Sequence, residues 1–569
     1  MLRFFSKKHG GVSGNRFNDI DPDEILLDSK NLPNFDVDQF EGRIEKPISF
    51  RTLIFFGIFC IFVLFTFLSR SFFLQVINGE EYYNRSEKNR LRNTTVFTQR
   101  GIIMDKNGVS LSWNVPNADT PEYALRKYID LDGFAHLLGY IKYPSKDKYG
   151  FYYNEKFVGK SGIEKYYDDE LSGENGTRIV ETDALGKVQT ESVLRPAKDG
   201  KDIKLSIDSA VQNELFKAIK DVAENVGFVG GAGVIMNVNT GEILAITSYP
   251  EYTSQVLTDG DNSAKILKYL NDSRTPFLNR AIDGLYTPGS TVKPFMSIGI
   301  LAEKIIDPDK SLYTEGFISV PNPYDHTKFT IFRDWKNHGY VDMREAIAVS
   351  SDVYFYMTGG GFGDQKGLGI ETINKYMNMF GFGQNISLEG FFSGPSGVVP
   401  NPRWKEVNFP GDPWRIGNTY HTSIGQYGYQ VTPMQLVRAV ASLANDGILL
   451  DPSIVVLDNN TQDISGVDLH LNLRDLRVVK EGMRMAVTDG MSQSLNFPNL
   501  KVAIKTGTAE LGTSKQYVNS LVTGFFPYDN PKYAFAVIME KGKVENTYGA
   551  TGVMKTVLEW LQVYGSEYL

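Results

Sequence analysis

Cysteine is almost absent from this sequence of 569 residues: Cys60 is the only one, and it lies within an apolar run. A disulfide inside the chain and a cysteine-based zinc cluster are therefore excluded. Histidine is scarce, with six scattered residues, and positive charge is not in excess, since 67 acidic residues outnumber 59 basic ones for a net charge of −8. No basic domain stands out, which argues against nucleic acid as the main partner.

Long apolar runs are rare too, and only one is present. Residues 52–69 carry no charge between Arg51 and Arg70, a length that just spans a bilayer as a helix. About fifty residues precede the run and no small-residue cleavage site follows it, which indicates an uncleaved anchor and not a signal peptide. The alternative is a buried core helix, but uncharged, phenylalanine-rich runs of this length are rare inside soluble domains. Basic residues are equally numerous on both flanks, so they do not decide the orientation.

The rest of the chain has an ordinary globular composition, with 42% apolar and 22% charged residues, and is long enough for two to four domains. Residues 1–51 show little apolar periodicity and predict a mostly disordered tail. Residues 70–201 predict a small, strand-rich, membrane-proximal module with a hairpin turn at Lys106-Asn-Gly108. Longer, well-patterned elements begin at residue 202 and define a larger domain, 202–569.

The larger domain alternates strands and helices in an order that predicts its fold. The patterns indicate strands at 202–208, 502–508, 520–526 and 533–539, a β-hairpin at 231–248 that turns at 239–241, and helices at 209–226 and 551–563. Strands from both ends of the domain can join one antiparallel sheet, with helices from both ends against it and a large helical insertion between them. The sequence therefore predicts an α+β layered fold.

One stretch of the larger domain, Thr287-Pro-Gly-Ser290-Thr-Val-Lys293-Pro, places a serine and a lysine one helical turn apart at the start of a helix. Residues i and i+3 share a face, so Lys293 is expected to reach Ser290. A serine becomes a good nucleophile when a base takes its proton, and a lysine can be that base if burial and nearby positive charge lower its pKa. Taken alone, Ser-x-x-Lys is more often a helix cap followed by a solvated lysine.

Two further motifs support acyl transfer. Ser350-Ser-Asp352 offers a hydroxyl and a carboxylate on a turn that opens a helix, and Lys505-Thr-Gly507-Thr508 places a cation and two hydroxyls beside a glycine on a strand. The glycine is expected to let a substrate lie against the strand edge. Each motif alone is common as a cap or a turn. In this order, however, Ser-x-x-Lys, Ser-Asp-Asn and Lys-Thr-Gly are the set typical of class A β-lactamases and penicillin-binding proteins.

On these residues the chain resembles the class B penicillin-binding proteins, which are monofunctional peptidoglycan transpeptidases, over about residues 70–569. The likeness includes Arg100-Gly-x-x-x-Asp105, Gly162-x-Glu164-x-x-Tyr167, Tyr286-x-Pro-Gly-Ser290, Ser423-Ile-Gly-Gln426 and Lys505-Thr-Gly-Thr-Ala509. Arg333-Asp-Trp335 and the aspartate at position 352, where division-type members usually have asparagine, are more similar to the elongation-type branch. The resemblance implies a penicillin-binding, serine β-lactamase-like catalytic domain at 202–569 and a dimerisation or pedestal-like module at 70–201.

The resemblance also implies catalytic roles. Ser290 would attack the penultimate D-alanine carbonyl of a stem peptide, with Lys293 as the base for acylation. Ser350 together with Lys505 would relay a proton to the leaving group. Asp352 would hydrogen-bond the backbone of the donor peptide. A neighbouring strand's amine would then resolve the acyl-enzyme.

Substrate binding is implied at the third motif. Thr506 and Thr508 would bind the terminal carboxylate with help from the charge of Lys505, beside Gly507. The backbone N–H groups of Ser290 and Thr508 would form the oxyanion hole, which usually supplies a large share of the rate enhancement in acyl transfer.

The resemblance places the protein as a single-pass protein of the cytoplasmic membrane, with residues 1–51 as a cytoplasmic tail and the catalytic domain outside. The implied partners are peptidoglycan stem peptides, β-lactams, a membrane-embedded glycosyltransferase and other elongation-complex proteins, without nucleic acid. Some elongation-type relatives carry zinc near the active site, and Asp334 and His338 lie in the corresponding region. Because no cysteine is available there, we predict no metal and no other cofactor.

Other functions share parts of this pattern. A D,D-carboxypeptidase or a β-lactamase would carry the same three motifs, but a membrane anchor followed by the Arg100 and Gly162 motifs fits neither well. A scaffold or β-lactam sensor would not need Ser290, Lys293 and Lys505 all intact, and sensors usually have several membrane helices. A division-type transpeptidase is the remaining alternative.

Overall fold

The computed structural model describes residues 49–148, 152–182, 188–322, 325–388, 392–456, 465–512, 515–546 and 548–569. The tail predicted for residues 1–51 therefore lies almost entirely outside the described residues. The chain divides into two compact units, Met1–Leu91 and Arg92–Leu569.

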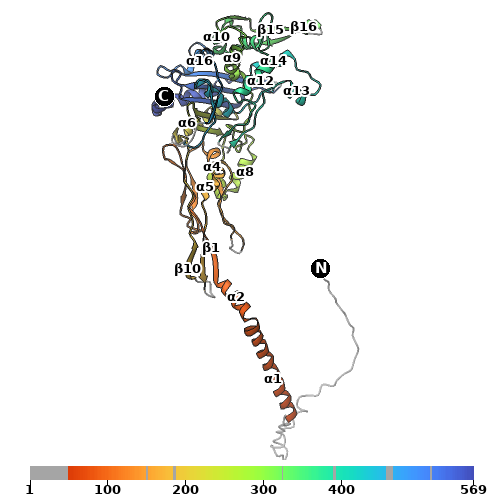
Figure 1. Ribbon diagram of the computed structural model, residues 1–569, viewed down its shortest axis with the longest axis vertical. Helices are drawn as coiled ribbons and strands as arrows, with labels where there is room; N and C mark the ends of the chain where they lie inside the picture. The colour runs from red at the N-terminus through yellow and green to blue at the C-terminus, as the bar shows by residue number, and fades with distance from the viewer. Residues whose placement is uncertain are drawn as a thin grey trace, which may run out of the picture. The chain divides into compact units, whose positions relative to one another are not determined.

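The first unit is helical where it is described. Helix α1 (Phe50–Phe72) continues through a π-helical turn, η4 (Phe73–Ile77), and α2 (Gly79–Arg90) follows (Figure 1). Within the stretch Phe50–Ile77, an 18-residue window has a mean hydropathy of 2.5, and none of its residues is buried. A helix of these 28 residues is about 42 Å long, enough for a hydrocarbon core of about 30 Å. The predicted single N-terminal apolar helix is confirmed, and within the described residues no other helix is long and apolar enough to cross a membrane.

The second unit begins with two small sheets, whose strand orders are β11-β2-β3-β4 and β1-β9-β10. Their strands are β1 (Leu91–Val96), β2 (Ile103–Met104), β3 (Ser110–Val115), β4 (Leu125–Tyr128), β9 (Gly176–Thr182), β10 (Val188–Arg195) and β11 (Ile203–Lys204). The predicted turn between β2 and β3 is confirmed: Gly108 donates its N–H to the carbonyl oxygen of Asp105 and has φ +86°, which glycine adopts without strain. Short elements complete this part: α3 (Ala135–Leu138), β5 (Ile141–Lys142), β6 (Ser145–Lys146), β7 (Tyr152–Asn154), β8 (Val158–Gly159), α4 (Gly162–Tyr166) and α5 (Asp168–Ser172).

The strand predicted at 202–208 differs from the structure. Only β11 is extended, and it pairs in parallel with β2 in the small sheet, so it is no part of the larger one. Leu205 then makes a single bridge to Val455. Asp208 accepts hydrogen bonds from the first amide groups of the next helix and is therefore its N-cap. The extended segment ends at this residue because the helix begins directly after it.

A buried ion cluster joins the two motifs of the membrane-proximal part. Glu164 accepts from Arg100 Nε at 2.6 Å and from Arg126 Nε at 2.7 Å, and all three side chains are at most 1% exposed. Burial opposes ionisation of Glu164, but the charges of Arg126 and Arg100 hold its pKa below the usual value. The Arg100-Gly and Gly162-x-Glu164 motifs are therefore two halves of one structural contact.

Replacing Glu164 by alanine is expected to lower the free energy of unfolding by about 3–5 kcal/mol, because buried Arg126 loses its counter-charge. Arg100 then keeps only its ion pair with Asp168. Urea denaturation followed by circular dichroism measures this loss. Glu174→Ala is the control, since its ion pair with Lys198 at 3.2 Å is solvent-exposed and should contribute little. Equal stability of the two variants would contradict a structural role for the cluster.

A five-stranded antiparallel sheet forms the centre of the larger domain, in the order β13-β12-β24-β23-β22. Its strands are β12 (Gly230–Asn237), β13 (Ile243–Tyr249), β22 (Ala503–Leu511), β23 (Tyr517–Phe526) and β24 (Tyr533–Lys543). The predicted hairpin and the three C-terminal strands are confirmed. Strand β22, which carries the Lys-Thr-Gly motif, is an edge strand, so one side of it is free to face other parts of the chain.

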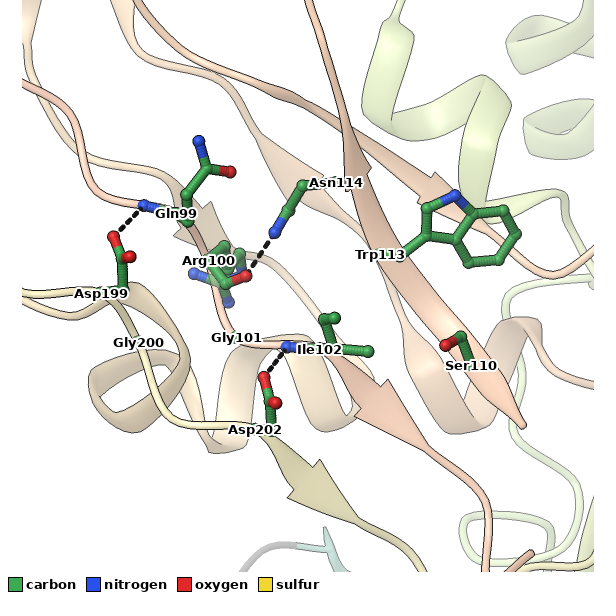
Figure 2. A pocket seen from close by; sticks show the side chains of 10 residues that line it. All are labelled: Gln99, Arg100, Gly101, Ile102, Ser110, Trp113, Asn114, Asp199, Gly200 and Asp202. Carbon is green, nitrogen blue, oxygen red and sulfur yellow. Dashed lines mark hydrogen bonds between the residues drawn. The ribbon is translucent and has the colours of Figure 1, made fainter. Parts of the chain in front are cut away.

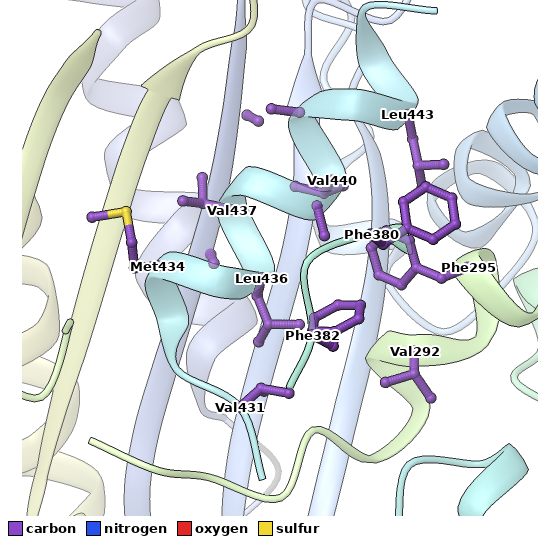
Figure 3. Packing of buried hydrophobic residues seen from close by; sticks show 14 of the residues in the cluster. Val292, Phe295, Phe380, Phe382, Val431, Met434, Leu436, Val437, Val440 and Leu443 are labelled. Carbon is purple, nitrogen blue, oxygen red and sulfur yellow. The ribbon is translucent and has the colours of Figure 1, made fainter. Parts of the chain in front are cut away.

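Helices cover both faces of this sheet. Successive residues of a strand point to opposite faces, and accordingly Ile235 joins a buried apolar cluster with α6 (Ser209–Val222) and α17 (Ala550–Tyr564). Its neighbour Val234 joins the other cluster, which includes α15 (Pro433–Ala444). Figure 3 shows side chains of α15 packing between the strands and the phenylalanines of the helical region.

Helix α9 (Lys293–Ala302) is buried from Lys293 to Leu301. Phe295 packs against Phe380 and Phe382 with ring centroids 5.0 and 5.2 Å apart (Figure 3). Because close-packed helices cannot shift without opening cavities, this packing holds the start of α9 rigidly.

Most of the remaining elements lie in the sequence between strands β13 and β22 of the central sheet. They are η5 (Ala223–Gly227), α7 (Ser254–Asp259), α8 (Ser263–Asn271), β14 (Leu312–Thr314), β15 (Phe317–Asn322), β16 (Asp325–Arg333), β17 (Gly339–Val341), α10 (Met343–Ala348), α11 (Asp352–Gly360), α12 (Ile370–Met379), β18 (Ser387–Leu388), β19 (Phe392–Ser393), α13 (Pro402–Asn408), α14 (Ile416–Ser423), β20 (Ile448–Leu450), β21 (Gly466–Asp468), α16 (Leu473–Thr488), η7 (Gln493–Leu495) and η8 (Ser566–Tyr568). The predicted α+β class with a helical insertion is confirmed.

Candidate active site

Ser290 lies in a short 3-10 turn, η6 (Gly289–Val292), immediately before α9. The turn is wedged between two other segments. Gly289 donates its N–H to the carbonyl oxygen of Gly425 at 3.0 Å, and a β-carbon on Gly289 would lie 2.9 Å from the carbonyl oxygen of Thr508 in β22. The candidate nucleophile is therefore held against the free side of the edge strand.

Gly507 makes this close approach possible. A β-carbon on Gly507 would lie 2.6 Å from the carbonyl oxygen of Pro288 and 2.8 Å from Thr291 Cγ2. The sequence predicted that this glycine makes room for a substrate. The structure shows that it makes room for the turn that carries Ser290, because backbone and side-chain atoms of that turn fill the space.

Three of the predicted catalytic side chains meet at Ser350. Lys505 Nζ donates to Ser350 Oγ at 2.8 Å, and Lys293 Nζ lies 3.3 Å from the same oxygen. Lys293 Nζ also donates to the carbonyl oxygen of Ser350 at 2.8 Å and to Asp352 Oδ1 at 2.6 Å. Both lysine side chains are buried, so these contacts are shielded from water.

The contact predicted between Ser290 and Lys293 is replaced by another one. Among the described residues, the Ser290 hydroxyl makes no hydrogen bond, and Lys293 is paired with Asp352. A buried ammonium group needs a counter-charge, and the carboxylate supplied by the start of α11 meets that need. Catalytic hydrogen bonds are often long in the absence of substrate, so the base role of Lys293 stays a prediction.

The carboxylate of Asp352 contacts Lys293 and, among the described contacts, not Lys505, which affects the protonation of Lys505. Burial, followed by the neighbouring charge of Lys293, holds the pKa of Lys505 well below its usual value, and the carboxylate of Asp352 opposes this shift. The resemblance implied two roles for Lys505, a charge that helps to bind the terminal carboxylate and a proton relay with Ser350. The lowered pKa fits the relay role, because burial and the nearby charge of Lys293 both favour loss of the proton.

Ser350 has a strained backbone. Its φ of +59° lies in the left-handed region, which non-glycine residues rarely adopt. Two backbone hydrogen bonds hold the turn, from Ser350 N to Ile347 O at 3.3 Å and from Ser351 N to Ala346 O at 3.0 Å. Such outliers cluster at functional sites. No pattern in the sequence predicted the left-handed backbone of Ser350.

The two threonines of the third motif remain apart from this cluster. Thr508 is exposed and Thr506 is half-buried. Lys505 Nζ donates to the carbonyl oxygen of Thr506 at 3.0 Å, while neither hydroxyl is bonded to the other predicted site residues among the described contacts.

Sequence reasoning considered Asp334 only as a possible metal ligand and did not foresee its contact with this cluster. The carboxylate of Asp334 bonds to the turn that carries Ser350 and Asp352. Its signal was the Arg333-Asp-Trp335 motif, which had been used only as a mark of likeness to a branch of the family. Among the described residues, no group of three or more cysteine, histidine, aspartate or glutamate side chains is arranged to hold a metal.

A cavity of about 680 Å³ lies in the membrane-proximal part, between Gln99 and Asp202, and includes none of the predicted site residues. Figure 2 shows that its two carboxylates each accept a backbone N–H group: Asp199 that of Gln99 and Asp202 that of Ile102. This cavity therefore gives no support to a second catalytic centre.

Two family models match the chain. The penicillin-binding protein transpeptidase domain matches residues 231–559, and the penicillin-binding protein dimerisation domain matches residues 114–205. The chain belongs to the penicillin-binding protein family of transpeptidases. The family and the enzyme class indicated by the sequence are thereby confirmed.

Several relatives are similar over most of their length. The peptidoglycan D,D-transpeptidase MrdA of Acinetobacter baumannii is 29% identical, over 88% of this chain and 86% of its own, and MrdA of Haemophilus influenzae is 30% identical, over 75% and 68%. Among solved structures, PBP2 of Helicobacter pylori in a complex with MreC has a TM-score of 0.68 and 26% identity, over 84% of this chain and 100% of that chain. PBP2 of Pseudomonas aeruginosa in complex with WCK 5153 has a TM-score of 0.68 and 29% identity, over 83% and 98%.

Proposed function

We propose that this protein is a membrane-anchored peptidoglycan D,D-transpeptidase that cross-links stem peptides during cell elongation. The observation that carries the proposal is the meeting of Lys293, Lys505 and Ser350 beside the turn of Ser290. Burying two ammonium groups together costs free energy that apolar side chains would not, so packing alone does not account for the cluster. The MrdA names of the relatives favour elongation over division.

Acylation is the first half of the proposed reaction. Ser290 Oγ forms a bond to the carbonyl carbon of the penultimate D-alanine while its proton passes to Lys293, which enters this step as the neutral amine. The peptide C–N bond then breaks, and the terminal D-alanine leaves as an amine that takes a proton from the Ser350 hydroxyl. Lys505 resupplies that proton across 2.8 Å, and its lowered pKa favours this donation.

Transfer to the acceptor is the second half. An amine from a neighbouring stem peptide attacks the ester carbonyl carbon and gives up a proton to Ser350, which passes its own proton back to Lys505. The C–O bond to Ser290 breaks, a new peptide bond forms, and Lys293 returns its proton to the serine oxygen. Lys293, Ser350 and Lys505 therefore serve both halves, because the second half is the reverse of the first with a different amine.

Substrate binding is assigned to β22 and to the start of α11. Thr506 and Thr508 bind the terminal carboxylate, and the N–H groups of Ser290 and Thr508 stabilise the oxyanion. The close approach of Gly289 to Thr508 supports this pairing. Asp352 Oδ1 is held by Lys293, which leaves Oδ2, on a side chain 22% exposed, to accept a backbone N–H of the donor peptide.

The location and partners follow from the substrate. Peptidoglycan lies outside the cytoplasmic membrane, so the catalytic domain is assigned to the outer side, with residues 1–51 in the cytoplasm and α1 as the anchor. We assign residues 70–201 to a dimerisation or pedestal-like module and 202–569 to the transpeptidase domain. By analogy with the H. pylori relative solved with MreC, an MreC-like protein and a membrane-embedded glycosyltransferase are the proposed elongation-complex partners.

Product analysis tests the function. The full-length protein in detergent is incubated with a donor stem pentapeptide, with and without an acceptor amine, and the products are separated by mass spectrometry. A cross-linked product that requires the acceptor supports transpeptidation. Free tetrapeptide alone would indicate a D,D-carboxypeptidase, and an acyl adduct that persists with the acceptor present would indicate a sensor.

A further inference from the structure

Asp334 is a fully buried carboxylate beside the predicted catalytic turn. It follows β16 directly, and its side chain is 0% exposed. Its Oδ2 accepts hydrogen bonds from Ser351 Oγ and from the backbone N–H of Val353, both at 2.9 Å. Its Oδ1 accepts from the N–H of Trp335 at 2.8 Å. A buried carboxylate with this many directed bonds constrains the segments that it joins.

Ser351 transmits this constraint. A serine hydroxyl has one proton to donate, and here that proton goes to Asp334. The hydroxyl's lone pairs are then left to accept the N–H of Tyr354 at 3.3 Å, which makes Ser351 the N-cap of α11. Asp334 thus fixes the rotamer of the cap and also accepts the N–H of Val353 in the first turn.

The residues on either side of Ser351 are the two that contact the lysines. Ser350, with its φ of +59°, receives Lys505 and Lys293, and Asp352 receives Lys293. A left-handed residue is retained only where its surroundings over-determine it. If the turn relaxed, both polar groups would leave the lysines.

We propose that Asp334 is a positioning residue for transpeptidation: it holds the Ser350-Ser351-Asp352 turn so that Ser350 and Asp352 face Lys505 and Lys293. It touches neither lysine among the described contacts and acts through Ser351 and Val353. The inference rests on the proposed roles of Ser350 and Asp352.

His338 does not offer an alternative explanation of the buried carboxylate. Its Nε2 lies 3.4 Å from Asp334 Oδ1, and its side chain is 1% exposed. Burial lowers the pKa of His338 despite the opposing charge of Asp334, so the imidazole is neutral near pH 7. Asp334 is therefore bonded mainly by neutral donors of the catalytic turn and its own loop, as a positioning group would be.

The test measures acylation of the full-length protein by a fluorescent penicillin, separating the binding constant from the rate constant of the covalent step. Asp334→Ala is expected to slow the covalent step by about 30-fold or more, while binding changes by less than about 5-fold. Asp334→Asn keeps one oxygen acceptor for Ser351 and Val353 and is expected to recover at least about 5-fold of that loss. In a double-mutant cycle, Ser351→Ala should add little to Asp334→Ala, since both act through one contact.

Asp208→Ala is the matched control. Asp208 is also a buried aspartate that caps a helix, accepting the N–H groups of Ala210 and Val211 at 2.9 and 3.0 Å, but it lies at α6. The Asp208→Ala substitution should lower the melting temperature at least as much as Asp334→Ala does. It should leave the acylation rate of the folded protein within about 3-fold of wild type.

Two failures are distinguishable. If Ser350→Ala slows acylation but Asp334→Ala matches Asp208→Ala in rate, the positioning role is overturned and the proposed function stands. If wild type does not acylate, or Ser350→Ala keeps the wild-type rate, the proposed catalytic roles fail instead.

Discussion

Replacing Ser290 by alanine should abolish covalent labelling by a fluorescent penicillin. A β-lactam presents a strained amide in place of the terminal dipeptide, so the nucleophile that attacks a stem peptide also opens the ring and remains acylated. Without the hydroxyl no ester can form, whatever the state of the lysines. The rate should fall by on the order of 10⁴-fold or more, the scale seen when a catalytic nucleophile is removed.

Labelling is followed by gel fluorescence and by intact-protein mass spectrometry. Ser297→Ala is the control on the same helix, since Ser297 is a buried serine whose hydroxyl only bonds back to the carbonyl oxygen of Lys293 at 2.9 Å. That variant should still take up one equivalent of label. Stoichiometric labelling of Ser290→Ala would place the nucleophile elsewhere in the chain.

Replacing Lys293 by arginine should leave a folded protein that binds the penicillin and acylates at least 10²-fold more slowly. Arginine keeps the positive charge and can still pair with Asp352, but its pKa, above about 12, prevents it from accepting the proton of Ser290. Loss of a general base usually costs about 10²–10⁴-fold in rate. The competing role for Lys293 is a purely structural ion pair. The 2.6 Å contact between Lys293 and Asp352 supports that role.

Stopped-flow acylation from pH 6 to 10 decides between the two roles. The control is Lys480→Arg. Lys480 lies on α16, is largely buried, and pairs with Asp446 at an Nζ–Oδ1 distance of 2.7 Å. A structural ion pair predicts that both arginine variants acylate nearly as fast as wild type. A base predicts that Lys293→Arg alone is slow and that added alkali does not restore it.

Local patterns in the sequence determined the elements on which the site is built. The hairpin of β12 and β13, the helices α6 and α17, and the single apolar helix α1 all agree with their predicted ranges to within a few residues. Alternation with period two and apolar spacing near 3.6 are properties of neighbouring residues, so no distant contact is needed to recognise them. The three motifs, through their order, also sufficed to identify the family.

Only the tertiary structure decided how the motifs use one another. Lys293 lies 59 residues before Asp352, and Lys505 lies 155 residues after Ser350. Which of these groups touch depends on how α9, α11 and β22 pack, and no local pattern encodes that. The sequence argument therefore paired Lys293 with its near neighbour Ser290, while folding brought a carboxylate closer.

The same reason explains the other differences. Gly507 makes room for the turn of Ser290, and Asp334 bonds to the turn of Ser350, because segments distant in sequence approach each other closely at the edge of the sheet and at the start of α11. A short polar motif reports which chemistry its residues can perform. The partner that each residue meets, and hence its charge and orientation, is set by burial and packing, which depend on the whole domain.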